Sequence, residues 1–142
     1  MNPSRFPLLI PLAAAALLAG CQSPHSAGQR GLVSVVGDQV VNASLETSDK
    51  GLARHVSLTG FTTQMLPNGL LKAEARLGST DHRDYSVQYK FRWFDAAGME
   101  ITTGDGAPWL PIVIHGGESV PATATSPLPG VTAVTVSIRH LK

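Results

Sequence analysis

The chain is poor in the residues that would link it covalently or give it a strongly charged surface. It has a single cysteine, so no intramolecular disulfide can form. Only 15% of its residues are charged, and Arg5 is the one charged residue of the first twenty, which leaves ten basic and ten acidic side chains in residues 21–142. A balanced domain without a basic run is not suited to neutralising phosphates, so we expect no nucleic-acid partner. The length of 142 residues excludes a large multidomain enzyme.

Motifs for catalysis and metal binding are also missing from the sequence. It contains no Gly-x-Ser-x-Gly, no His-Glu-x-x-His, no glycine-rich phosphate loop and no paired cysteines. No two of its five histidines lie within four residues of each other, so only the fold could assemble a metal site. We therefore predict no enzyme, no metal and no cofactor. A metal-dependent hydrolase that uses His82, His115 and nearby carboxylates is the last of the alternatives.

The first twenty-one residues have the layout of a secretory signal. Arg5 is followed by residues 6–19, which include no charged or polar side chain. As a helix, this stretch would rise roughly 21 Å, less than the roughly 30 Å of a bilayer core, so a transmembrane span is the weaker interpretation. The stretch ends in Leu-Ala-Gly-Cys at residues 18–21, which resembles the lipobox of bacterial lipoproteins. The resemblance implies cleavage between Gly20 and Cys21 and attachment of acyl chains such as palmitate to Cys21.

The acyl chains would set the location of the protein. Each buried CH₂ group contributes about 0.8 kcal/mol, so several chains hold a protein on a membrane without an apolar protein surface. Gln22 follows the cysteine, which under the enteric sorting rule implies the periplasmic side of the outer membrane, with the inner membrane as the alternative. We divide the chain into a signal peptide (1–20), an acylated cysteine with a flexible tether (21–31) and a folded domain (32–142).

Residues 85–93 predict a half-buried β-strand, because large apolar and polar side chains alternate there without a break. In a helix, the same apolar side chains would be scattered around the axis. Five of the seven aromatic residues that follow the signal peptide lie between Tyr85 and Phe94, so we expect this strand to cross the core, with Trp93 buried.

Similar alternation or strand-like composition occurs in seven other segments: residues 35–43, 55–65, 71–77, 99–103, 109–115, 118–125 and 131–140. Residues 95–98 have the Asp and Gly of a type I turn. Pro111 and Pro121 cannot donate hydrogen bonds to a neighbouring strand, which predicts edge strands or bulges. We expect no helix longer than one turn. The pattern predicts an all-β fold, an antiparallel immunoglobulin-like β-sandwich of about seven or eight strands, with a small barrel as the alternative.

Two features are candidates for a partner-binding site. Asp81, His82, Arg83 and Asp84 follow one another between two predicted strands, where two carboxylates beside an imidazole suit a cation or acid/base work, but also an ordinary solvated loop. Trp109 follows a loop rich in turn residues. We expect Trp109 to plug the core at the end of a sheet; the alternative is an exposed Trp109, which would be the best candidate for a contact hot spot.

Residues 89–100, Tyr-Lys-Phe-Arg-Trp-Phe-Asp-Ala-Ala-Gly-Met-Glu, resemble the core of the YcfL family of bacterial periplasmic lipoproteins. Other family positions are matched in order by Trp109, Gly117, Glu118, Pro127 and Arg139. The chain has Gly-Ser-Thr at residues 78–80, where the family usually has Asn followed by Ser or Thr. The resemblance covers about half the chain, from residue 71 onward, together with the lipobox. It implies an immunoglobulin-like envelope lipoprotein in a family without an assigned biochemical role or catalytic residues.

These observations predict a lipid-anchored periplasmic protein that acts as a non-catalytic binding module for another envelope protein. Family genes often neighbour that of a lipoprotein activator of a peptidoglycan synthase, which associates the resemblance with envelope or peptidoglycan assembly. The alternative is an inhibitor or sensor that binds a hydrolase or a cell-wall fragment through the Trp109 loop.

Overall fold

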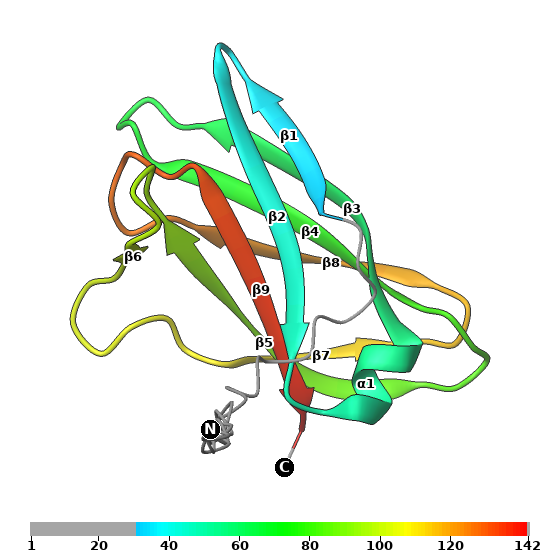
Figure 1. Cartoon of the computed structure of the whole chain (residues 1–142). Coiled ribbons are helices and arrows are strands. Elements are labelled where there is room, and N and C mark those ends of the chain that lie inside the picture. Colours follow the sequence, from blue (N-terminus) through cyan, green and yellow to red (C-terminus); the bar gives the residue numbers. More distant parts are fainter. Residues whose placement is uncertain (1–30, 142) are drawn as a thin grey trace, which may run out of the picture.

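The fold is known from a computed structural model that describes residues 31–141 (Figure 1). These residues form two β-sheets and one short helix, so the expected all-β sandwich is confirmed. The signal peptide, Cys21 and nearly all of the expected tether lie outside the described residues. Between residues 31 and 141, no helix has the length and hydropathy needed to cross a bilayer.

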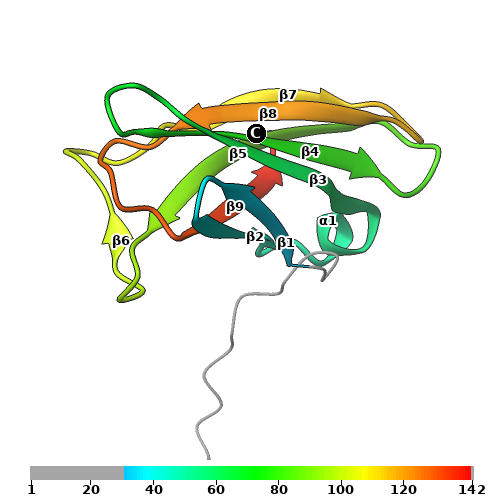
Figure 2. The same ribbon diagram turned by 90° about the horizontal axis from the view of Figure 1, so that it is seen from above.

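The two sheets face each other across the core (Figure 2). They meet along one edge, where Oγ of Ser34 lies 2.8 Å from Oγ1 of Thr63. The larger sheet contains β1 (Leu32–Val36), β2 (Gln39–Thr47), β9 (Ala133–His140), β5 (Tyr85–Phe94) and β6 (Glu100–Ile101) in that order, and β7 (Leu110–Ile114) also pairs with β5. The smaller sheet contains β3 (Val56–Met65), β4 (Leu71–Ser79) and β8 (Ser119–Thr125). The expected antiparallel pairing holds for every strand pair of the described residues except β2 with β9, which are parallel. The sandwich has nine strands, where about seven or eight were expected.

Strand β5 lies against the middle of the core, as its sequence predicts. Its inward side chains are Val87, Tyr89, Phe91 and Trp93, and the least buried of them, Tyr89, is only 9% exposed. Tyr89 contacts Phe91 edge to face at 6.0 Å between ring centroids, and Phe91 stacks on Trp93 at 5.5 Å. Such aromatic pairs are worth about 0.5–1.5 kcal/mol beyond the area they bury. The row of rings therefore fixes which face of β5 points inward.

The two prolines lie in edge strands, as expected. Strand β7, which contains Pro111, pairs only with β5, and strand β8, which contains Pro121, pairs only with β4. Proline has no N–H group to donate. On the open side of an edge strand there is no neighbouring strand to accept a hydrogen bond, so none is lost there. The interpretation of these segments as edges is confirmed.

Two strand predictions differ from the structure. The segment 35–43 is not one strand, because the chain reverses at Gly37 (φ 59°) and Asp38 to form the β1–β2 hairpin. A positive φ is accessible to glycine without steric cost, so this residue allows a tight turn inside an apolar run. The segment 99–103 forms only the two-residue strand β6, because the chain leaves the sheet after Ile101.

A helix, α1 (Lys50–His55), was not expected from the sequence. The side chain of Asp49 caps it by accepting hydrogen bonds from the main-chain N–H groups of Gly51 (2.8 Å) and Leu52 (3.0 Å). Leu52 is fully buried and anchors the helix to the core. Helix α1 and strand β6 lie at opposite ends of the sandwich in both views (Figures 1 and 2). One large apolar side chain, Leu52, in six residues is too little for a helical periodicity to be visible.

Replacing Leu52 by Ala should lower the free energy of unfolding by about 2–5 kcal/mol, because it opens a cavity under α1. The matched control is Leu128→Ala, at a loop position that is 47% exposed, where the change should stay within about 0.5 kcal/mol. Urea denaturation of both variants measures the difference. Equal losses would mean that α1 does not belong to the folded core.

Candidate functional site

Trp109 lies on the outer face of the larger sheet. Leu110 is paired with Tyr89, so the preceding residue continues the register opposite Lys90, whose side chain points away from the core. The Nζ atom of Lys90 lies 5.0 Å from the centroid of the indole ring, and the guanidinium carbon of Arg139 lies 4.1 Å from it. Two cations therefore hold the ring against the sheet through cation–π contacts.

The core position that the sequence favoured for Trp109 is wrong. The side chain is half-buried, outside the set of residues that make up the core. Residues 102–108, which precede it, are all exposed. The indole lies outside because β7 enters the sheet one residue after it, with Leu110 rather than Trp109 on the inward side.

A shallow groove runs beside the indole. Its volume is about 380 Å³, and besides Trp109 it is bordered by Glu46, Arg92, Ser137 and Arg139. The pairings of β2 with β9 and of β9 with β5 place Glu46, Ser137 and Lys90 in one row across the sheet. We call the surface formed by Trp109, Lys90, Arg92, Arg139, Ser137 and Glu46 the Trp109 face.

Polar neighbours hold both arginines of this face. Arg92 forms a two-pronged contact with Glu100, through Nη2–Oε2 (2.7 Å) and Nε–Oε1 (3.2 Å), and also lies 3.3 Å from Oε2 of Glu46. The hydrogen bond from Arg92 lowers the pKa of Glu100 and outweighs the opposing effect of burial. The Nε atom of Arg139 donates to Oε1 of Gln88 (2.9 Å). Because these side chains hold one another, the face is ordered before any partner binds.

The loop at residues 81–84 does not form the cluster that its sequence suggested. Asp81 pairs with His55, which is far from it in the sequence, instead of with the adjacent His82. Its Oδ2 lies 3.0 Å from Nδ1 of His55. It also accepts hydrogen bonds from the hydroxyl of Tyr85 (2.8 Å) and the main-chain N–H of Arg83 (2.9 Å). These contacts, led by the Arg83 N–H group, lower the pKa of Asp81. Asp81 therefore serves as an acceptor that closes the loop.

The second aspartate of the loop points elsewhere. Asp84 accepts a hydrogen bond from the main-chain N–H of Gly116 (2.9 Å), and its Oδ2 lies 3.2 Å from Nδ1 of His115. Gly116 packs on His82 so closely that a Cβ there would lie 2.3 Å from the His82 carbonyl carbon. The side chains of His82 and Arg83 are exposed. In the described part of the chain, no three potential metal ligands gather at one point.

Sequence reasoning missed the partners of both aspartates. His55, Tyr85 and His115 come from the end of α1, the start of β5 and the turn after β7. Only the sheet topology brings His55 and His115 to this loop, whereas Tyr85 lies four residues after Asp81 and could have been found from its local spacing. A third pair, His140 with Asp49 (3.4 Å), lies near the same end of the sandwich, beside α1.

The fold and this surface define a β-sandwich protein that carries a half-buried tryptophan on an ordered, polar sheet face. Comparison with family models then gives the family: the chain belongs to the one described as "Protein of unknown function (DUF1425)", whose model matches residues 38–140. None of the curated proteins compared with the chain matches it.

Two solved structures are similar to the chain. One is a DUF1425 family member from Shewanella sp. pv-4, which has 24% sequence identity and a TM-score of 0.52, with 87% of this chain and 98% of that chain covered. The other is the Campylobacter jejuni protein cj0090, with 20% identity and a TM-score of 0.49, covering 59% of this chain and 85% of that one. The Shewanella structure supports the fold.

The two tryptophans should respond differently to truncation. Trp93→Ala should lower the free energy of unfolding by about 3–5 kcal/mol, because Trp93 is a buried core residue. Trp109→Ala removes two cation–π contacts on a half-exposed ring and should cost no more than about 2 kcal/mol. Thermal and urea unfolding of the two variants measure this difference, and a loss at Trp109 as large as that at Trp93 would place the indole in the core.

The lowered pKa of Asp81 makes the stability of the protein depend on pH. A carboxyl group whose pKa lies below its ordinary value of 3.8 in the folded state stabilises the fold above that value, and this contribution is lost as the pH falls through the folded pKa. Asp81→Asn should therefore be less stable than the parent at pH 7, and the difference should shrink below about pH 4.

Urea unfolding between pH 7 and pH 2 provides the measurement. Asp38→Asn, in the β1–β2 turn, is the control, because Asp38 forms no ion pair within the described residues. If the difference in unfolding free energy between the parent and Asp81→Asn stays constant from pH 7 to pH 2, Asp81 does not stabilise the fold as an ionised acceptor.

Proposed function

We propose that the protein is a lipid-anchored envelope protein on the periplasmic side of the outer membrane, where it acts as a non-catalytic binding module for another envelope protein. The signal layout and the lipobox-like sequence that ends at Cys21 support the location. The resemblance of residues 89–100 to the YcfL family is what supports a role in envelope assembly. We propose acylation of Cys21 as the anchor, with the inner membrane as the alternative site.

The observation that carries the binding role is the position of Trp109. An indole that is half-exposed and fixed by Lys90 and Arg139 loses little conformational entropy when a partner covers it. Tryptophan and arginine are also the side chains most enriched in contact hot spots. The Arg92–Glu46 ion pair borders the same groove as the indole and gives it a polar edge, as in other protein interfaces. The Trp109 face therefore has the composition of a protein contact surface.

The contacts of the loop at residues 81–84 support a structural role for its two aspartates, rather than acid/base chemistry. Asp81 and Asp84 each accept a main-chain hydrogen bond and each lie beside a histidine from another segment. Within residues 31–141, the hydroxyl groups that bond to Asp81 belong to Ser79 and Tyr85, and neither is bonded to an imidazole. The arrangement closes one end of the sandwich and is not needed for the proposed binding.

The groove beside Trp109 favours a second candidate function. A volume of about 380 Å³ lies in the range of small-ligand sites, and an aromatic wall with arginine, glutamate and serine side chains suits a sugar or a peptide fragment. On this alternative, the protein is an inhibitor or sensor that binds a hydrolase or a cell-wall fragment.

Site-specific photocrosslinking in the cells that make the protein tests the proposal. A photoreactive residue at Ser137, on the Trp109 face, should yield a reproducible crosslinked protein. The same residue at Thr123, on the outer face of the smaller sheet, is the matched control and should not. Adding Trp109→Ala should reduce the Ser137 product by about tenfold or more, because hot-spot truncation costs about 2 kcal/mol or more.

Three outcomes discriminate the hypotheses. A protein partner that depends on Trp109 supports the binding module. A carbohydrate product at Ser137, or a hydrolase as the crosslinked protein, supports the second candidate. Identical products from Ser137 and Thr123, or none from either, would refute a specific contact at the Trp109 face.

A further inference from the structure

One edge of β5 is incompletely paired. On the side away from β9, β7 pairs with β5 as far as Tyr89, and β6 pairs with it from Trp93 onward. The chain between these two strands, residues 102–109, forms a loop instead of a continuous strand. Residues 90–92 of β5 thus have no strand beside them on this edge. We call this stretch the β5 gap.

The main-chain groups that face the β5 gap belong to Phe91. The main-chain N–H of Leu141 donates to the carbonyl of Ser86 (3.1 Å), so even-numbered residues of β5 turn their N–H and C=O groups toward β9. The N–H of Asp95 donates to the carbonyl of Met99 (3.0 Å), so odd-numbered residues turn the other way. Tyr89 and Trp93 lie opposite β7 and β6, and no described residue forms a hydrogen bond with the Phe91 main chain on this side.

An unpaired main chain at this position is unusual. Phe91 is only 3% exposed, and most buried N–H and C=O groups in proteins are hydrogen-bonded. A molecule bound at this edge could give both groups a hydrogen-bond partner. One N–H and one C=O that point in the same direction match the C=O and N–H of one residue in an extended peptide.

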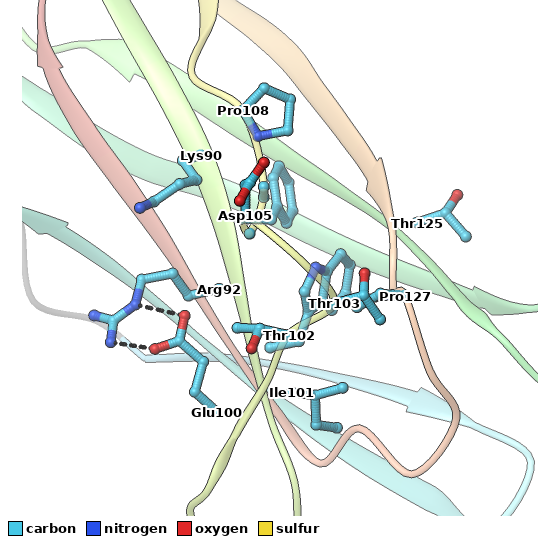
Figure 3. A pocket seen from close by; sticks show the side chains of 14 residues that line it. Lys90, Arg92, Glu100, Ile101, Thr102, Thr103, Asp105, Pro108, Thr125 and Pro127 are labelled. Carbon is cyan, nitrogen blue, oxygen red and sulfur yellow. Dashed lines mark hydrogen bonds and ion pairs between the residues drawn. The ribbon is translucent and has the colours of Figure 1, made fainter.

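A cavity of about 300 Å³ opens on this edge. It is lined by four consecutive residues, 90–93, whose side chains alternate between the two faces, so the edge of the strand itself forms its wall. Figure 3 shows the Arg92–Glu100 pair on one side of this cavity and Thr125 and Pro127 on the other. Its charged lining residues are two basic ones, Lys90 and Arg92, and two acidic ones, Glu100 and Asp105, so the charges balance and do not favour a charged molecule.

A smaller chamber of about 130 Å³ adjoins the cavity and shares part of its lining. Its other walls are mainly apolar, with Tyr89, Leu110 and Ala124 among them. The loop that borders both spaces contains Gly104 and Gly106 at positive φ, with no atom near the position of a Cβ, and one hydrogen bond closes it, from Gly106 N–H to the Thr103 carbonyl (3.2 Å). The loop has few contacts to break when a molecule enters.

We propose that the β5 gap binds one residue of an extended peptide, whose main chain pairs with that of Phe91 and whose apolar side chain enters the chamber beside Ala124. Strand pairing provides the main-chain hydrogen bonds, and the chamber provides specificity for an apolar side chain. The inference rests on the proposed function in one respect, because it takes the extended peptide to be a segment of the protein partner. It is tested with isolated peptides, so it can fail while the Trp109 contact stands.

Amide hydrogen exchange, followed by NMR on the full chain in detergent micelles, gives the first test. In the free protein, the N–H of Phe91 should exchange at least about tenfold faster than those of Tyr89 and Trp93, which the structure pairs with β7 and β6. Equal protection of the three amides would show that Phe91 already has a partner, and it would overturn the proposal.

The second test uses the blocked tripeptide acetyl-Ala-Leu-Ala-amide, with acetyl-Ala-Asp-Ala-amide as its control. Saturation with the leucine peptide should slow Phe91 exchange by about tenfold or more, and the aspartate peptide should not. Absence of any effect at millimolar peptide, or an effect confined to the open edge of β8, would overturn the proposal.

Substitutions separate the two binding surfaces. Ala124→Leu fills the apolar chamber and should abolish the effect of the leucine peptide, and its thermal unfolding is recorded to show that the fold is intact. Ala96→Leu, in the exposed turn after β5, is the matched control and should bind as the parent does. Trp109→Ala should retain peptide binding even where it loses the photocrosslink. An Ala124→Leu chain that folds and still binds would contradict the assigned chamber.

Discussion

Burial of the aromatic row on β5 is the interaction on which the rest of the structure depends. Tyr89, Phe91 and Trp93 fill the space between the sheets, and the side chains of β9 that lie opposite them are also buried. Once these rings point inward, the alternation of a strand forces Lys90 and Arg92 outward. The polar face that holds Trp109 is thus a direct consequence of how the core is packed.

The same stretch of β5 borders both of the surfaces to which we assign binding. Lys90 contacts the indole of Trp109 and also lines the cavity at the β5 gap, and Arg92 lies at the border of both. The loop at residues 102–109 separates them, with Trp109 at its end. A partner that covers the indole and inserts an extended segment would therefore contact both sides of this loop.

At the other end of the sandwich, polar contacts add to the burial of Leu52. Three aspartates, Asp49, Asp81 and Asp84, cap a helix, close a loop and join two turns, and each also lies beside a histidine. Main-chain N–H groups are the largest cause of the lowered pKa in all three carboxyl groups. In a domain without disulfides, such acceptors hold the connections between strands that the apolar core does not reach.

The sequence by itself determined the class of fold, the course of β5, the edge positions of Pro111 and Pro121, and the family resemblance, because alternation, proline chemistry and local motifs are properties of neighbouring residues. It did not reveal α1 or the β1–β2 hairpin, since one capping aspartate and one glycine leave little trace in periodicity. Only the tertiary structure decided that Trp109 lies outside the core, that Asp81 and Asp84 bond to histidines of other segments, and that the Phe91 main chain faces a cavity. These features depend on strand register and on which strands become neighbours, and both are set by the packing of segments that lie far apart in the chain.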